Sequence, residues 1–186
     1  MGEAKIATSI RILSAAAVLF ASNPYRDTSV DEIAEKAGLT KMTVYQHFKS
    51  KDRLFVACLR MRLERREAKL DQFFEGLRPD ADRLLAIFDW LEDWLNPKNF
   101  QGCSFVKAVS ELSAIVPEVR EIAMEAKQKI RQRITTVAKT SGRTNSTELG
   151  QELALIFEGA QSLAFIEGSV RPAQVARRVA HKLLTR

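Results

Sequence analysis

Five polar side chains belong to a short stretch whose spacing predicts a helix, on the part of it that apolar packing leaves exposed, and together they could bind nucleic acid. They are Lys41, Thr43, Tyr45, Gln46 and His47. Side chains of this size and polarity reach phosphate oxygens and base edges, where they form hydrogen bonds. A metal site at the histidine is disfavoured, because no Cys, His or Asp lies at metal-ligand spacing from it. The chemistry expected of this stretch is therefore DNA binding.

Two short helices joined by a tight turn would position these side chains. Ser29 can cap the first helix, and Glu32 three residues later completes a capping box. Gly38 stands where a helix ends in the left-handed conformation, which glycine adopts without a Cβ clash. Thr40 can cap the second helix, and the small Ala34 allows the two helices to cross closely. This pattern predicts a helix-turn-helix.

The same stretch resembles the DNA-binding domain of the TetR family of bacterial transcriptional regulators. The matching segments are 28–34, 37–41, 43–45, 47–48 and 50–52, together with Leu54. The resemblance implies a homodimeric repressor that binds a pseudo-palindromic operator. It also implies that the repressor releases this operator when a small molecule occupies its C-terminal domain.

The resemblance assigns roles to individual residues as well. Those expected to reach base edges and nearby phosphates are Lys41, Met42 and Thr43. Those expected to hold the phosphate backbone, or to lie where it passes, are Tyr45, His47, Lys51, Thr28 and Ser29. Met42 stands where many members carry a smaller residue, so it either touches a thymine methyl group or crowds the groove. For Tyr45, a half-buried place in the core is the alternative.

The composition of the chain indicates an all-α fold. Of the 186 residues, 46% are hydrophobic, and only 8 are Gly and 5 are Pro. Long stretches follow the helical period and none alternates as a strand does, so about nine helices are expected. The net charge of +6 points mildly towards a polyanionic partner. An apolar stretch at residues 10–21 is too short to span a membrane, so a soluble protein without a membrane partner is expected.

The chemistry of the remaining residues argues against an enzyme. The chain has two histidines and no glycine-rich phosphate loop, and no nucleophile stands beside a base. No cofactor is expected for the same reasons. The two cysteines do not make a disulfide framework, which fits a reducing cytoplasm.

The chain is expected to have two functional parts. Residues 1–50 form a helix-turn-helix DNA-binding domain, and residues 51–186 form a helical domain for ligand binding and dimerisation. A long helix from Lys51 to about Gly76 joins the two parts. The next helix is expected to begin near Pro79.

A helix expected over residues 147–167 is apolar on nearly all sides and must be covered on all of them. Only one short helix follows it, so a second copy of the chain is the economical partner. The residues expected in this two-fold, four-helix interface are Leu153, Phe157, Ala160, Leu163, Ala164, Val175, Val179 and Leu183. The alternative is that both helices are central to the bundle of a monomer.

The C-terminal helices hold more aromatic side chains than a bundle of this length needs. Large rings that cannot all interdigitate leave room for a ligand. The expected ligand-binding residues are Phe88, Trp90, Trp94, Phe105 and Phe157, with Glu111 and Gln161 as polar groups. An apolar or aromatic effector, neutral or cationic, would suit them. The alternative is a dry core in which the rings merely pack.

A basic helical protein that binds nucleic acid or another polyanion without sequence choice is the rival function. The capped helix-turn-helix argues against it, because binding by charge alone needs no such geometry. A salt titration with specific and scrambled DNA would separate the two, since a non-specific binder has the same affinity for both.

Overall fold

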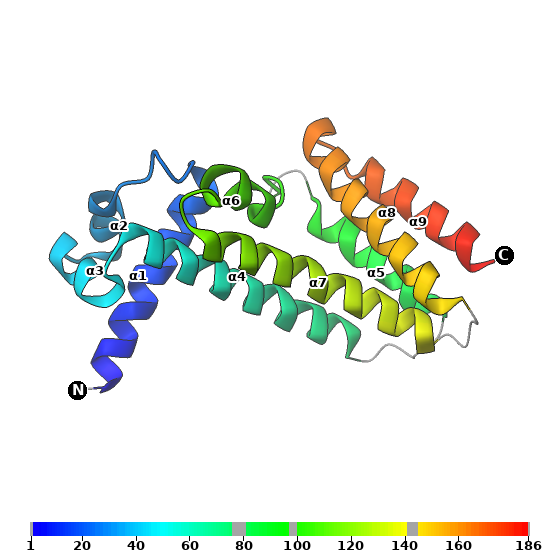
Figure 1. Cartoon of the computed structure of the whole chain (residues 1–186), viewed down its shortest axis with the longest axis horizontal. Helices are drawn as coiled ribbons and strands as arrows, with labels where there is room; N and C mark the ends of the chain where they lie inside the picture. Colours follow the sequence, from blue (N-terminus) through cyan, green and yellow to red (C-terminus); the bar gives the residue numbers. More distant parts are fainter. Residues whose placement is uncertain (1, 76–80, 97–99, 141–144, 186) are drawn as a thin grey trace. The chain divides into compact units, whose positions relative to one another are not determined.

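The secondary structure consists of α-helices, without strands, in the residues that the structure, a computed structural model, describes: 2–75, 81–96, 100–140 and 145–185. Figure 1 shows the helices along the chain. They are α1 (Gly2–Ser22), α2 (Val30–Ala37), α3 (Lys41–Phe48), α4 (Lys51–Phe74), α5 (Ala81–Trp94), α6 (Ser104–Leu112), α7 (Pro117–Thr140), α8 (Ser146–Glu167) and α9 (Arg171–Leu184). The prediction of an all-α fold with about nine helices is confirmed. The boundaries expected at Gly76 and Pro79 lie outside the described residues.

Contacts between residues divide the chain into two units. The first unit contains Met1–Arg66 and Ser104–Ala123, and the second contains Glu67–Cys103 and Met124–Arg186. Helices α4 and α7 therefore each contribute residues to both units. The functional boundary expected after residue 50 concerns which part binds DNA and which binds a ligand, and it stays a prediction.

Helices α1 to α4 enclose the core of the first unit. Its buried members are Ile12, Ala16, Val30, Ile33, Ala34, Val44, Leu54 and Cys58. Ala34 is 4% exposed, as expected of a small residue at a close helix crossing. Burial raises the pKa of the Cys58 thiol to about 12, so this thiol stays protonated near neutral pH. The core thus fixes α2 and α3 in a defined geometry.

The apolar part of α1 is longer than expected. Its segment Ala4–Ser22 has 19 residues and a mean hydropathy of 1.6, which by length and composition would allow it to cross a membrane. The expectation that this stretch is too short is therefore wrong, because the helix continues on both sides of residues 10–21. It is the one helix of this kind in the described part of the chain. In the structure, Ile12 and Ala16 of this helix belong to the core of the first unit.

Helices α5, α8 and α9, with parts of α4 and α7, enclose the core of the second unit. Helix α9 packs against both α8 and α5. Helices α7 and α8 approach closely at Gly150, where an added Cβ would lie 2.7 Å from Cα of Thr135. Real Cβ atoms essentially never approach this closely, so only glycine fits here.

Gly150→Ala is therefore expected to lower the free energy of unfolding by about 1–3 kcal/mol, the usual cost of overpacking a core. Urea denaturation of the variant measures it. Thr135→Ala should not rescue the variant, because the backbone Cα of residue 135 is as close as the side-chain hydroxyl. Unchanged stability of Gly150→Ala would contradict the close packing of α7 on α8.

Candidate nucleic-acid interface

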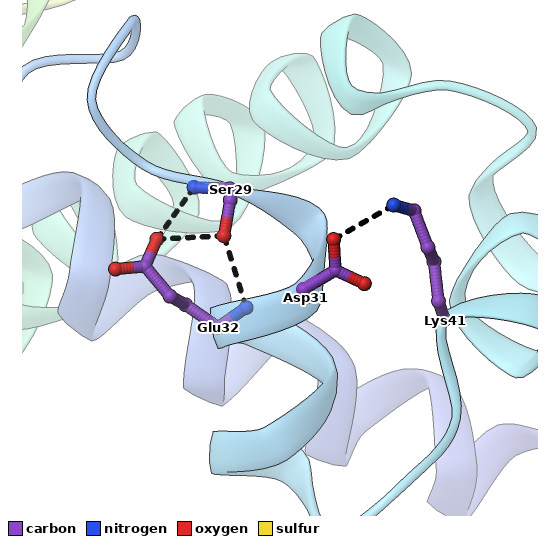
Figure 2. Close-up of polar contacts among 4 residues, drawn as sticks. All are labelled: Ser29, Asp31, Glu32 and Lys41. Atoms are coloured by element: carbon purple, nitrogen blue, oxygen red, sulfur yellow. Dashed lines mark hydrogen bonds and ion pairs between the residues drawn. The ribbon is translucent and has the colours of Figure 1, made fainter.

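The first turn of α2 carries the capping box that the sequence indicates (Figure 2). The backbone N–H of Ser29 donates to Oε2 of Glu32 at 2.7 Å, and the N–H of Glu32 donates to Oγ of Ser29 at 3.1 Å. Oε2 of Glu32 also accepts a hydrogen bond from the Ser29 hydroxyl at 2.8 Å, and the two hydrogen bonds that this carboxylate accepts from Ser29 lower its pKa. At the other end, Gly38 has φ 62° and ψ 43°, the left-handed conformation that closes the helix. The local chemistry expected for α2 is confirmed.

The turn after α2 is also held from α1, by a side chain that the sequence did not single out. Nη2 of Arg11 donates to the carbonyl oxygen of Ala37 at 2.7 Å. The last carbonyls of a helix lack intrahelical partners and carry a partial negative charge. A guanidinium group at this position satisfies one of them and favours the conformation of the turn. The pattern of short-range spacing could not reveal this contact, because 26 residues separate the two groups.

Thr40 caps the N-terminus of α3, because its hydroxyl accepts a hydrogen bond from the N–H of Thr43 at 3.2 Å. The hydroxyl groups of Thr40 and Thr43 are also hydrogen-bonded to each other, at 2.9 Å. Val44 is buried in the core, whereas Met42 is 67% exposed and Tyr45 is 38% exposed. Gln46 is exposed as well. Helix α3 therefore presents Met42, Tyr45 and Gln46 to solvent.

Lys41 is paired with an acidic residue of α2 (Figure 2). Its Nζ donates to Oδ2 of Asp31 at 2.7 Å, and this hydrogen bond and the carboxylate charge raise the pKa of Lys41. Both side chains are more than half exposed. Because water screens such pairs, the interaction is weak and can be exchanged for another anion. A DNA phosphate or a base acceptor could thus replace Asp31 as the hydrogen-bond partner of Lys41.

His47 is oriented by a serine of α1. Oγ of Ser9 and Nδ1 of His47 are 2.7 Å apart, in a hydrogen bond that joins α1 to α3. A neutral imidazole that accepts this bond at Nδ1 carries its proton on Nε2. That second nitrogen is then a donor that can reach an acceptor such as a phosphate oxygen. Ser9 was missed in the sequence, because nothing local relates it to a residue 38 positions away.

Lys51, the first residue of α4, lies against an aromatic ring. Its Nζ is 4.1 Å from the ring centroid of Tyr25. Burial lowers the pKa of the Lys51 ammonium group. The hydroxyl of Tyr25 in turn donates a hydrogen bond to Asp52, and burial together with this bond raises the pKa of Tyr25. Lys51 is thus held in one place at the start of α4.

Two residues expected at functional sites have other partners in the first unit. Thr28 is 1% exposed, and its hydroxyl donates to the carbonyl oxygen of Pro24 at 3.1 Å. Its side chain therefore stabilises the connector between α1 and α2 and offers no surface. Oε2 of Glu111 accepts a hydrogen bond from the N–H of Tyr25 at 2.8 Å. This carboxylate ties α6 to the same connector.

The residues expected to bind a ligand fall in both units. Phe88, Trp90, Trp94, Phe157 and Gln161 belong to the second unit, whereas Phe105 and Glu111 belong to the first. Ring contacts within α5 and between α5 and α8 bring the four aromatic residues of the second unit together. Phe105 is 4% exposed and lies beneath the guanidinium group of Arg66, 5.3 Å from ring centroid to Cζ.

The residues expected at a dimer interface also separate into two groups. Four of them are buried in the core of their own chain: Leu153, Phe157, Ala160 and Ala164. They cannot offer surface to a partner, because their face of α8 already packs within the second unit. Leu163, Val175 and Val179 are 50%, 41% and 38% exposed, and Leu183 is half-buried. Further exposed apolar residues on α8 are Leu155 and Ile166, at 75% and 74%.

Known families match both parts of the chain. Residues 12–58 match the family described as bacterial regulatory proteins, tetR family, and residues 81–180 match the family described as tetracyclin repressor-like, C-terminal domain. The chain is also similar to the uncharacterized HTH-type transcriptional regulator YvkB of Bacillus subtilis (strain 168). The two are 30% identical over 145 residues, which cover 78% of this chain and 73% of that protein.

Solved structures agree in fold. A TetR transcriptional regulator from Chloroflexus aurantiacus J-10-FL superposes with a TM-score of 0.83 at 25% identity, covering 98% of this chain and 96% of that one. A protein of Saccharomonospora viridis, crystallised with choline, superposes with a TM-score of 0.75 at 21% identity, covering 100% and 97%. The second likeness shows the fold alone.

The C-terminal match covers more than half of the 186 residues, and the N-terminal match covers the whole helix-turn-helix. The capped α2 and α3 supply the DNA-binding geometry, and the similar proteins are transcriptional regulators rather than enzymes. The chain is thus a transcriptional regulator with a DNA-binding helix-turn-helix, and it belongs to the TetR family.

Proposed function

We propose that this protein is a cytoplasmic repressor that binds a pseudo-palindromic operator as a homodimer and releases it when a small effector binds. The observation that carries the proposal is α3, which is capped, fixed by the core and open to solvent on its donor-bearing face. Such a helix can enter the major groove with its N-terminal residues at base edges. Two copies related by a two-fold axis would read two half-sites about 34–36 Å apart, or a multiple of that distance.

The exposed apolar residues of α8 and α9 support the homodimer. Leu155, Leu163 and Ile166 lie along one stripe of α8, because their spacing of eight and three residues follows the helical period. Gly159 lies within this stripe, and an added Cβ there would meet nothing within 4 Å of the same chain. A glycine within an apolar stripe allows close approach of a second helix. We propose that this stripe, with Val175 and Val179 of α9, forms the two-fold interface.

Helix α4 supports the release step. It begins with Lys51 in the first unit and ends in the second unit. A ligand in the second unit that shifts α4 would move Lys51 and, through Asp52, the connector at Tyr25. Such a movement changes the separation of the two recognition helices in a dimer, so the half-sites no longer match. The backbone N–H of Tyr25 also donates a hydrogen bond to Glu111, which attaches α6 to this connector.

Thermodynamic reciprocity tests the release step. If an effector lowers the affinity of the protein for the operator by some factor, the operator must lower the affinity of the protein for that effector by the same factor. Tryptophan fluorescence titrations with and without operator DNA measure both factors. Equal affinity of the compound for free and DNA-bound protein would overturn ligand release.

The proposed contact of the Lys51 side chain with the DNA phosphate backbone gives a separate prediction. Lys51→Ala should weaken binding to every DNA sequence similarly and reduce the salt dependence of log K by about one unit, because one phosphate contact is lost. Lys69→Ala is the matched control, since Lys69 is an exposed lysine further along α4. A salt slope equal to that of the unaltered protein would remove Lys51 from the DNA-contacting surface.

A further inference from the structure

Two acceptor oxygens of α8 are buried without a hydrogen-bond partner. They are Oε1 of Gln161 and Oε1 of Glu158. Gln161 is 5% exposed. The other carboxylate oxygen of Glu158 pairs with Nζ of Lys127 on α7. A buried acceptor left unpaired costs about 1–3 kcal/mol, so two such groups on adjacent turns of one helix call for a specific reason.

Both groups lie on an arc of α8 that also carries two phenylalanines. At 3.6 residues per turn, Phe157, Glu158, Gln161 and Phe165 fall within an arc of about 100°. Gln161 occupies the middle of this arc. Phe157 lies one turn before it and Phe165 one turn after it.

A continuous chain of ring contacts connects these two phenylalanines. The ring of Phe157 stacks on Trp90 with centroids 6.5 Å apart, and Trp90 stacks on Trp94 at 5.4 Å. Trp94 meets Phe100 edge-on at 5.3 Å, and Phe100 meets Phe165 at 6.4 Å. Gln161 therefore lies on α8 between the two ends of an aromatic arc. Trp90, Trp94 and Phe100 are half-buried and Phe165 is exposed, so the arc retains access to solvent.

The charges of this arrangement favour one kind of ligand. Carboxylate and amide oxygens accept hydrogen bonds and cannot donate them, so the unpaired atoms require donors. The faces of indole and phenyl rings are electron-rich and attract cations. A ligand carboxylate would meet two acceptor oxygens and the negative faces of the rings. An ammonium group attached to an apolar body would satisfy both features at once.

We propose that this face of α8, with the aromatic arc of α5, binds a small aromatic or aliphatic ammonium ligand. Its N–H groups donate to Oε1 of Glu158 and Gln161, and its apolar body lies against the half-buried rings of Trp90, Trp94 and Phe100. The inference rests on the proposed role of the second unit in effector binding. It names the chemical class of that effector, which the proposed function leaves open.

A matched pair of probes tests the proposal on the full-length protein without DNA. The probes are 4-phenylbutylammonium and 4-phenylbutyrate, which share a body and differ in charge. The only two tryptophans of the chain are Trp90 and Trp94, so their fluorescence reports on this site. The ammonium probe should change the fluorescence in a saturable way, and the carboxylate should bind at least about tenfold more weakly. Equal binding of the two probes, preference for the carboxylate, or binding of neither would overturn the proposal.

Variants of Gln161 separate a ligand site from a structural role. Gln161→Leu should reduce the affinity for the ammonium probe about tenfold, because the acceptor is lost. The same variant should unfold at an equal or higher temperature, because it removes an unsatisfied polar group from the interior. Gln161→Glu should bind the ammonium probe more tightly, and Gln151→Leu, at an exposed glutamine of α8, should leave probe binding unchanged.

The results of the probe-binding experiments can be distinguished from the results that test the proposed DNA-binding function. A loss of stability in Gln161→Leu with unchanged probe binding would show a purely structural glutamine and overturn the ligand site. Operator affinity measured on the same variant should equal that of the unaltered protein. A failure of probe binding would therefore leave the DNA-binding function intact, whereas a failure to bind operator would leave the probe experiment valid.

Discussion

Leu163→Arg is expected to convert the protein into a monomer. Leu163 is 50% exposed on the α8 stripe, and a second copy would bury the introduced guanidinium group in an apolar interface without an ionic partner. A monomer engages one half-site at a time, so its operator affinity should fall at least about 100-fold through the loss of bivalent binding. Sedimentation velocity gives the oligomeric state, and a fluorescence anisotropy titration gives the operator affinity.

Met124→Arg is the control for this substitution. Met124 is an exposed apolar residue of α7, at 65%, and lies outside the proposed interface. It should leave the sedimentation coefficient and the operator affinity unchanged. Val179→Asp should reproduce the monomer from the neighbouring helix α9. An unaltered protein that is monomeric at micromolar concentration would contradict the two-fold operator arrangement as a whole.

Lys41→Ala is expected to change which DNA sequence the protein prefers. If Lys41 reads a guanine edge, its loss should reduce discrimination at one base pair about 5- to 150-fold, with little change at the other positions. Affinities for a set of operators with single base-pair changes measure this effect. A uniform loss across all of these operators would instead assign Lys41 to the phosphate backbone.

Asp31→Asn tests the same contact from the other side. Asp31 holds Lys41 at 2.7 Å in the free protein and adds a negative charge beside the DNA-facing helix. Its neutralisation should raise affinity for all DNA, because Lys41 is freed and one repulsion is removed. Glu35→Gln makes the same change in charge one turn further along α2, away from this pair, and should raise affinity less. Equal effects of the two variants would show that only net charge matters.

The sequence predicted the helix-turn-helix well because its signals are local. The caps at Ser29, Glu32, Gly38 and Thr40 act within three or four residues, and each has the predicted geometry in the structure. The contacts of Arg11 with the end of α2 and of Ser9 with His47 join distant segments, so no spacing rule could find them. For the same reason the sequence did not predict that Thr28 is buried, because its burial depends on the path of the connector between α1 and α2 and not on its residue type.

In the second unit, the sequence predicted which helix is apolar but not which of its faces packs within the chain. Helical periodicity indicated that α8 is apolar on nearly all sides, and this holds: Leu153 is fully buried whereas Leu155 is 75% exposed. Periodicity does not tell which side packs within the chain. Residues assigned from the sequence to a partner, such as Ala160, therefore proved to serve the internal core, and the available stripe lies on the opposite side of the helix. The tertiary packing of α5 and α9 decides between the two faces.

Selection from a random pool of duplex DNA is the most direct test of sequence-specific operator binding by a dimer. The selected sites should form an inverted repeat whose half-sites are centred one helical turn apart or a multiple of it. At physiological salt, the protein should bind a selected site at least about 1,000-fold more tightly than a scrambled duplex of the same length. Selection of no common sequence, with equal affinity and equal salt dependence for both duplexes, would contradict sequence-specific binding and identify a protein that binds DNA by charge alone.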